Sequence, residues 1–252
     1  MKNELKIHEV NPLSANSRRS FLKIGGLAVA GTGLFLVGCS EDDATESESL
    51  ARKGHKPGIK NGVFDLGGND LGVLTYAYAL EQLEADFYTK VVNATGFTTN
   101  FTAEDQQVLT DLYKHEVIHR EFFRAVLTSV LPNPNKQLLP NLAFDYGSLN
   151  FSSRDQVLAT AKALEDTGVA AYNGAGKLLQ NVDYLVLAGK IVSVEARHAS
   201  AIRSLINPNS KDFAGDDVVD PTTGLDQALD PSQVLAIADG FIATPFTAQY
   251  LP

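Results

Sequence analysis

The sequence predicts an all-α fold, a four-helix bundle in which one long crossover joins the second and third helices. Four stretches of some 23–29 residues contain no proline and repeat apolar residues at helical spacing. The links within each pair of helices are short, whereas residues 131–151 form a long connection with three prolines. Such link lengths are typical of a bundle with one crossover, in which helices 2 and 3 lie parallel. Another all-α arrangement is the alternative.

The first two helices have clear sequence limits. The first is expected over residues 70–92, where no proline interrupts the apolar pattern. Thr102 and the acidic residues that follow it are typical of a helix start. The second helix should therefore run from there to about Val130, since prolines follow at once over residues 131–134.

The third helix should begin after Ser152 or Ser153 and run to about Gln180. The fourth is expected over residues 183–206, where an Asn-Pro pair follows it. We therefore assign residues 69–206 to the bundle.

The two helix pairs also repeat a motif. Ala-Leu-Glu ends at Glu81 and again at Glu165, and a tyrosine follows seven residues later in each case, Tyr88 and Tyr172. Each half then adds one Glu-x-x-His. After the bundle, residues 207–252 form a loop-rich tail with one short helix expected near residues 231–239.

The N-terminal segment 1–38 has the features of an export signal. Residues 17–23 (SRRSFLK) resemble the twin-arginine signature. The apolar run after them is too short to span a bilayer comfortably and is typical of a signal peptide. It ends in LVGC, residues 36–39, which resembles a bacterial lipobox, so Cys39 is expected to be lipidated.

Cys39 is the single cysteine of the chain, which excludes an intramolecular disulfide and a thiolate metal site. A buried small hydrophobic residue is the alternative to lipidation. Residues 39–68 are polar and charged, and they predict a disordered acidic tether. Its first residues, 40–43 (SEDD), are similar to surface-export signals of outer-membrane lipoproteins. We expect a protein anchored by lipid in the bacterial envelope, at the outer membrane and exposed at the surface if those residues act as such a signal.

The charge of the chain limits its partners. The whole chain carries −9, and removal of residues 1–38, which carry +3, leaves −12. This balance argues against nucleic acid or an anionic lipid surface as a partner.

Four glutamates stand on the apolar stripes of the four predicted helices, so all four should point into the bundle. Glu116 and Glu195 are each followed three residues later by a histidine on the same face, His119 and His198. Four buried carboxylates beside two neutral imidazoles would repel one another strongly. Either several carboxylates are protonated or cations fill the site, and two divalent ions would supply the missing charge. We therefore interpret the two Glu-x-x-His pairs as metal ligands.

This order of ligands resembles the ferritin-like di-iron/di-manganese carboxylate superfamily. The stretch ALEQLEADFY, residues 79–88, and the tail PSQVLAIADGFI further resemble its secreted, desiccation-related branch. The resemblance implies that Glu116 and Glu195 bridge two ions, iron or manganese, and that the other ligands are terminal. The expected metal ligands are Glu81, Glu116, His119, Glu165, Glu195 and His198.

Three further residues are candidates for a catalytic role. Glu84 lies three residues after Glu81 and could face the same site, or else solvent. Tyr88 and Tyr172 could donate hydrogen bonds to ligands or act as redox-active phenols. An ordinary buried tyrosine is the alternative for each. His115 could contact a ligand, although a histidine on the helix surface is the favoured interpretation.

The third helix contains three glycines, Gly168, Gly174 and Gly176. Gly168 takes the place that Glu84 holds in the first half. It could open a path for a small molecule, or only allow helices to pack closely.

A di-metal carboxylate site suggests chemistry on O₂ or peroxide, in defence against oxidative stress. A storage cage does not suit a tethered chain, and a peroxidase needs an electron donor that this chain does not carry. A catalase-like dismutase needs no reductant and is the favoured hypothesis. A non-enzymatic protein that protects or binds envelope components during desiccation, with a structural metal site, is the alternative. Carbohydrate binding is less favoured, because the chain has no tryptophan.

Overall fold

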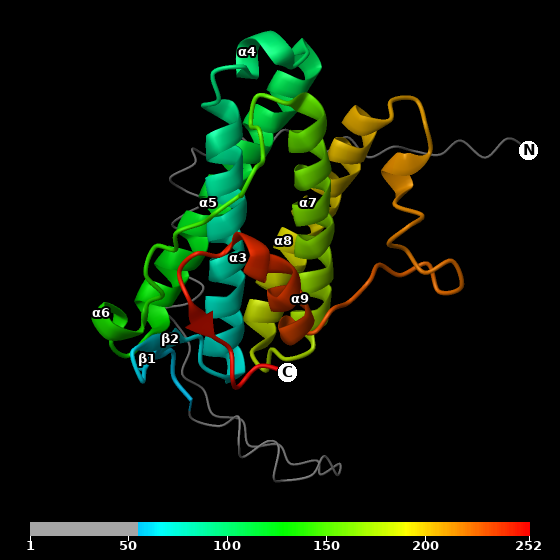
Figure 1. Ribbon diagram of the computed structural model, residues 1–252. Coiled ribbons are helices and arrows are strands. Elements are labelled where there is room, and N and C mark those ends of the chain that lie inside the picture. Colours follow the sequence, from blue (N-terminus) through cyan, green and yellow to red (C-terminus); the bar gives the residue numbers. More distant parts are fainter. Residues whose placement is uncertain (1–54) are drawn as a thin grey trace, which may run out of the picture. The chain divides into compact units, whose positions relative to one another are not determined.

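The computed structural model describes residues 55–252. The predicted signal peptide, the lipidation site at Cys39 and the first part of the predicted tether lie outside these residues. The all-α prediction is confirmed for the part described, since four long helices make up most of it (Figure 1). None of the helices in residues 55–252 combines the length and the apolarity needed to cross a membrane.

The four long helices pack as two pairs. Helix α3 (Asn69–Val92) packs mainly against α5 (Ala103–Val130), and α7 (Arg154–Gly176) against α8 (Val182–Ile206). The connection from α5 to α7 returns along the bundle, so both helices begin at the end where the short helix α4 (Phe97–Asn100) lies (Figure 1). Helices 2 and 3 of the prediction are therefore parallel.

A buried amide holds this crossover in place. The Gln82 side chain, on α3, accepts a hydrogen bond of 2.9 Å from the backbone N–H of Leu142 and donates one of 3.3 Å to the carbonyl of Pro140. A further short helix, α6 (Pro134–Gln137), lies at the beginning of the crossover. One polar side chain of the bundle thus satisfies a backbone carbonyl and a backbone N–H of the crossover, which has no regular secondary structure at this point.

One arginine joins three helix ends. Thr102 and Asp105 form a capping box at the start of α5. Arg154, at the start of α7, binds both carboxylate oxygens of Asp105 at 2.8 Å and donates to the carbonyl of Leu205 near the end of α8. Arg154 thus connects α5, α7 and α8 at the end of the bundle where α5 and α7 begin and α8 ends.

Helix α7 ends earlier than the sequence predicts. It stops at Gly176 rather than near Gln180, and the chain turns back toward α8. The carboxylate of Asp70, at the start of α3, accepts hydrogen bonds of 2.7 and 3.0 Å from the backbone N–H groups of Gln180 and Asn181. These N–H groups are satisfied from another helix, so they do not continue α7.

Residues 58–65 differ from the predicted disordered tether. They form the strands β1 (Gly58–Lys60) and β2 (Val63–Asp65), and β2 also pairs in parallel with β3 (Phe246–Thr247) from the tail. Asp65 is fully buried and accepts hydrogen bonds from Lys60, Gly67 and Thr247. The tail provides strand β3 as a partner for β2, and Thr247 of the tail donates a hydrogen bond to Asp65. The sequence of residues 39–68 by itself gives no sign of these contacts.

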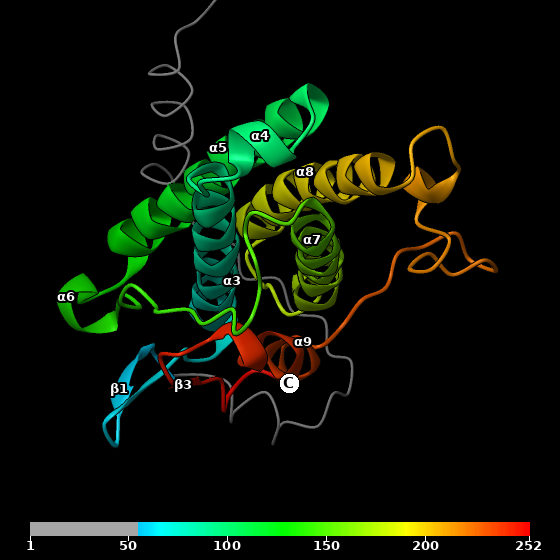
Figure 2. The same cartoon turned by 45° about the horizontal axis from the view of Figure 1, so that its top comes forward.

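The tail packs on the bundle rather than extending from it. It contains the 3₁₀ turns η1 (Asp212–Ala214) and η2 (Asp239–Phe241) and the helix α9 (Pro231–Ala238), which lies at the predicted position. Helix α9 lies beside α3 and α7 (Figure 2). Ile237 and Ala238 of α9, with Phe241 of η2, line a small pocket together with the interior residue Glu84.

Candidate metal centre

Each long helix contributes one glutamate to the interior of the bundle. Glu81 lies on α3, Glu116 on α5, Glu165 on α7 and Glu195 on α8, and all four side chains are inaccessible to solvent. The apolar residues around each of them form the packed helix face, so a carboxylate at that position is carried inward with it.

The cluster consists of two overlapping sets of ligand atoms. In each set, one nitrogen or oxygen of every residue lies within 4.8 Å of those of the others. Glu116 and Glu195 belong to both sets. The first set is completed by Glu81 and His119, and the second by Glu165 and His198.

The two shared glutamates direct one oxygen to each side. Glu116 places Oε2 3.3 Å from Nδ1 of His119 and Oε1 2.8 Å from Nδ1 of His198. Glu195 places Oε1 2.9 Å from the first nitrogen and Oε2 3.4 Å from the second. By contrast, Glu81 approaches only His119 and Glu165 only His198, each at 3.4 Å. The geometry thus separates two carboxylates that lie near both histidines from two that each lie near one histidine.

Burial and mutual repulsion shift the pKa values of these groups. Desolvation, with the charge of Glu195, raises the pKa of Glu116 to about 8, and desolvation raises the pKa of Glu165 to about 7. Burial also opposes ionisation of Glu195, but the adjacent imidazoles of His119 and His198 outweigh it and lower its pKa to about 2. Burial would lower the pKa of His198, but the carboxylates around it raise it to about 12, and the same causes raise the pKa of His119. Protons on the two histidines and on Glu116 or Glu165 therefore offset the negative charge of the glutamates, and bound cations could take the place of these protons.

The unpaired atoms of the cluster fit metal ions. Among the buried side-chain nitrogen and oxygen atoms of residues 55–252, ten have no hydrogen-bond partner, and all but those of Tyr76 and Asp230 belong to the six predicted ligands. They comprise both oxygens of Glu116 and Glu195, one oxygen each of Glu81 and Glu165, and Nδ1 of His119 and His198. Buried polar atoms are rarely left unpaired in folded proteins. Carboxylate oxygens with imidazole nitrogens are a donor set suited to divalent iron or manganese.

The two tyrosines bind the terminal glutamates reciprocally. Tyr88, on α3, donates a hydrogen bond of 2.5 Å to Oε1 of Glu165 on α7. Tyr172, on α7, donates to Oε1 of Glu81 on α3. Both phenols therefore touch a predicted ligand, which the sequence could only suggest. Desolvation and the adjacent carboxylates raise the pKa of both hydroxyls, so both remain protonated donors.

Glu84 is buried beside the cluster rather than exposed to solvent. Desolvation and the charges of the four cluster glutamates raise its pKa well above the ordinary value, which favours the protonated form. A Cβ atom at Gly168 would lie 2.9 Å from Oε1 of Glu84. The glycine of the second half therefore makes room for the glutamate of the first half.

His115 contacts the cluster, although its side chain is exposed. Its Nδ1 lies 2.9 Å from Nε2 of His198, and the two rings stack with centroids 5.2 Å apart. The favoured interpretation from sequence, a histidine on the helix surface, identified the exposure and missed this contact. His115 lies one turn before His119 on α5, but its partner is on α8, so spacing along one helix gave no signal.

Four glutamates and two histidines thus meet at the centre of four long helices and could hold metal there, which is the arrangement expected of a ferritin-like domain. The family model described as a ferritin-like domain matches residues 69–208, more than half of the chain. The chain therefore belongs to this family. A comparison with curated proteins gives no match.

Proposed function

We propose that this chain binds two divalent metal ions, iron or manganese, and uses them to act on peroxide or O₂. One observation carries this proposal. Glu116 and Glu195 each place one carboxylate oxygen near His119 and the other near His198. Two such carboxylates suit a pair of ions that share both ligands. When bound, two adjacent redox-active ions could supply the two electrons that cleavage of an O–O bond requires and take back the two that oxidation of peroxide to O₂ releases.

The protein groups have distinct roles in this proposal. Glu81 with His119, and Glu165 with His198, would hold one ion each. The phenols of Tyr88 and Tyr172 keep the terminal carboxylates in place. Glu84, which is buried and favours its protonated form, can give a proton to a departing oxygen atom and take one back. The apolar side chains around the cluster limit the access of water.

Peroxide dismutation is the reaction that we favour. It converts two molecules of hydrogen peroxide into one of O₂ and two of water, so it needs no external reductant. The chain has a single cysteine, at position 39, and hence no Cys pairs of the rubredoxin type that could supply electrons. A peroxidase reaction would require an electron donor on another protein.

The location that we propose is the bacterial envelope. Support comes from the twin-arginine motif in residues 17–23 and the lipobox at residues 36–39. Export in the folded state would allow the metal to be loaded before translocation. Mass spectrometry of the N-terminal peptide tests this proposal: a diacylated or triacylated Cys39 supports it, and an unmodified Cys39 contradicts it.

The experiment that tests the function combines metal content with peroxide turnover. The protein, purified from a host given both iron and manganese, should contain about two ions per chain and release O₂ from hydrogen peroxide. Glu116→Ala removes a shared ligand and should abolish turnover and lower the metal content, whereas Glu121→Ala, on the exposed face of the same helix, should change neither. Absence of metal, together with an unchanged melting temperature in chelator, would contradict the proposal.

A structural role for the ions is the second candidate. The cluster connects all four long helices, so bound metal would fasten the bundle even without turnover. This role would suit the protective function that the desiccation-related resemblance suggests. Two bound ions that raise the melting temperature, with no reaction with peroxide or O₂, would favour it.

A further inference from the structure

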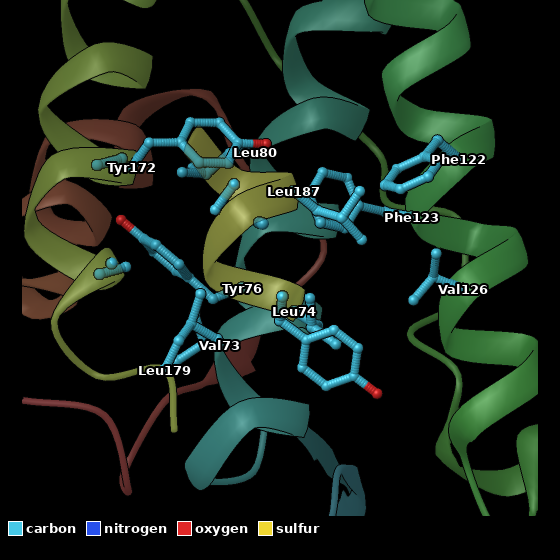
Figure 3. Close-up of a pocket in the computed structure, with 16 residues that line it drawn as sticks. Val73, Leu74, Tyr76, Leu80, Phe122, Phe123, Val126, Tyr172, Leu179 and Leu187 are labelled. Carbon is cyan, nitrogen blue, oxygen red and sulfur yellow. The ribbon is translucent and has the colours of Figure 1, made fainter. Parts of the chain in front are cut away.

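An apolar pocket lies inside the bundle (Figure 3). One of its lining residues, Tyr172, binds Glu81 of the candidate metal centre. It is formed by the first half of α3, the second halves of α5 and α7, and the start of α8. Half-buried side chains of α5 and α8, among them Phe122, Val126 and Leu187, form its outer rim. The pocket therefore extends from the helix surface toward the centre of the bundle.

The lining has almost no polar atoms. Every residue along it is Val, Leu, Ala, Gly, Phe or Tyr, and no charged side chain contributes. The hydroxyl of Tyr172 is already committed to Glu81, whereas the buried hydroxyl of Tyr76 has no hydrogen-bond partner. A buried water typically requires two to four polar partners. The third tyrosine of the lining, Tyr184, is only half-buried, so Tyr76 alone brings a fully buried, unpaired phenol to the pocket. One such phenol does not meet that requirement, so the pocket favours an uncharged molecule of low polarity.

The size of the pocket limits its occupant further. The space open to small molecules is about 30 Å³. Since roughly 10–15 Å³ of such space accommodates one water, the pocket can hold one or two diatomic molecules. It has no room for an acyl chain or a ring compound.

The inner end of the pocket reaches the cluster through two aromatic side chains. Tyr172 lines the pocket with its ring, while its hydroxyl binds Glu81. Phe123 packs against that ring with centroids 6.4 Å apart and lies one turn after His119 on α5. A molecule in the pocket would therefore contact the ring that positions a terminal ligand.

We infer that this pocket binds dioxygen and connects the helix surface to the side of the cluster formed by Tyr172 and Glu81. Dioxygen is small, uncharged and apolar, as the lining and the volume require. It would be the product of peroxide dismutation, the reaction favoured above, and the substrate of a reaction with O₂. The role of the pocket as a route rests on the proposed function, whereas the binding itself does not.

Xenon tests the binding without metal chemistry. Crystals of the protein pressurised with xenon should show an occupied site beside Tyr172. Ala188→Phe would place a phenyl ring at the rim, where Ala188 is half-buried, and should abolish that site. Ala201→Phe is the matched control, because Ala201 is also half-buried on α8 and does not line the pocket. Absence of xenon in the unsubstituted protein would overturn the inference.

Rates test the route. In the iron-loaded protein, oxidation by O₂ should slow several-fold in Ala188→Phe and stay unchanged in Ala201→Phe, while the metal content of both stays normal. Equal rates in the two variants would overturn the assignment as a route. If the loaded, unsubstituted protein does not react with O₂ or peroxide at all, the proposed function fails, and the xenon result still decides whether the pocket binds small apolar molecules.

Discussion

Tyr88 and Glu165 belong to opposite halves of the repeated helix pairs and are joined by a buried hydrogen bond of 2.5 Å. Tyr172 and Glu81 form the matching bond in the reverse direction. Each half of the repeat therefore positions the terminal carboxylate of the other half. Because the bonds cross between α3 and α7, they couple the two helix pairs at the level of the cluster.

Loss of one of these phenol hydroxyls should weaken both the fold and the metal site. For Tyr88→Phe we expect a loss of about 1.5–3 kcal/mol in the free energy of unfolding, the usual range for a hydrogen bond to a charged group. Metal affinity should fall as well, since Glu165 loses the donor that orients it. Denaturant titration and equilibrium dialysis measure the two effects. Tyr113→Phe, on α5 and without a side-chain hydrogen bond in the described residues, is the control. A Tyr88→Phe variant with unchanged stability and affinity would show that the bond is dispensable.

His115 should support one metal position more than the other. Its Nδ1 faces Nε2 of His198, so it can accept the proton of that ring while Nδ1 of His198 binds metal. Loss of such an outer partner typically lowers metal affinity about 10–100-fold. In His115→Ala, a calorimetric titration with Mn²⁺ should therefore show one weakened binding step and one normal step. His115→Gln, which keeps a hydrogen-bond acceptor, should restore part of the affinity. Equal weakening of both steps would refute the assignment.

Glu84 should affect turnover without holding metal. Glu84→Gln keeps the size of the side chain in the space beside Gly168 but removes the acidic proton. Metal content should remain near that of the unsubstituted protein, while peroxide turnover falls about 10²-fold or more, as for loss of a general acid–base group. Glu121→Gln, on the exposed surface of α5, should leave both unchanged. A Glu84→Gln variant with normal turnover would remove Glu84 from the mechanism.

The metal-free protein should lose stability as the pH rises above about 5. The pKa values of Glu116, Glu165 and His198 are raised in the folded state, to about 8, 7 and 12, so the folded state binds more protons than the unfolded chain above pH 4.5. Stability therefore falls with pH in that range. Glu195, whose pKa is lowered to about 2, acts in the opposite sense below pH 4.5.

Metal should reverse this trend, because bound ions replace the protons of the cluster. The difference in melting temperature between the metal-loaded and metal-free forms should widen from pH 5 to pH 8. Each kcal/mol corresponds to about 2–4 °C for a domain of this size. Differential scanning calorimetry of both forms measures the difference. A constant difference across this range would contradict protonation of the metal-free cluster.

Gly174 should tolerate no side chain. A Cβ atom there would lie 1.8 Å from the carbonyl oxygen of Leu229, where the tail backbone crosses α7. Gly174→Ala must displace the tail, and we expect a loss of about 1–3 kcal/mol in the free energy of unfolding. At Gly176 the nearest atom would be 3.7 Å away, so Gly176→Ala should be neutral or slightly stabilising. Denaturant titration of the two variants makes the comparison, and equal stabilities would show that the tail does not press on α7.

The sequence predicted the helices and the six candidate ligands because both leave a local signal. A glutamate on an apolar helix face is costly without a partner, so its position alone indicates a site. Contacts between distant segments leave no such signal. The pairing of β2 with β3 joins residues near 64 to residues near 246. The contact of His115 with His198, and the early end of α7 beside Asp70, also depend on neighbours that only the folded chain supplies.

The pairing of Glu84 with Gly168 has a consequence for the origin of the repeat. A single helix pair that carries Ala-Leu-Glu, the later tyrosine and one Glu-x-x-His would close the same cluster by associating with an identical copy of itself. In that symmetric dimer both positions would hold glutamate, and the two side chains would compete for one space, or both would hold glycine and the acid would be lost. Fusion of two copies into one chain removes this restriction. It lets one half keep the carboxylate while the other half diverges to make room for it.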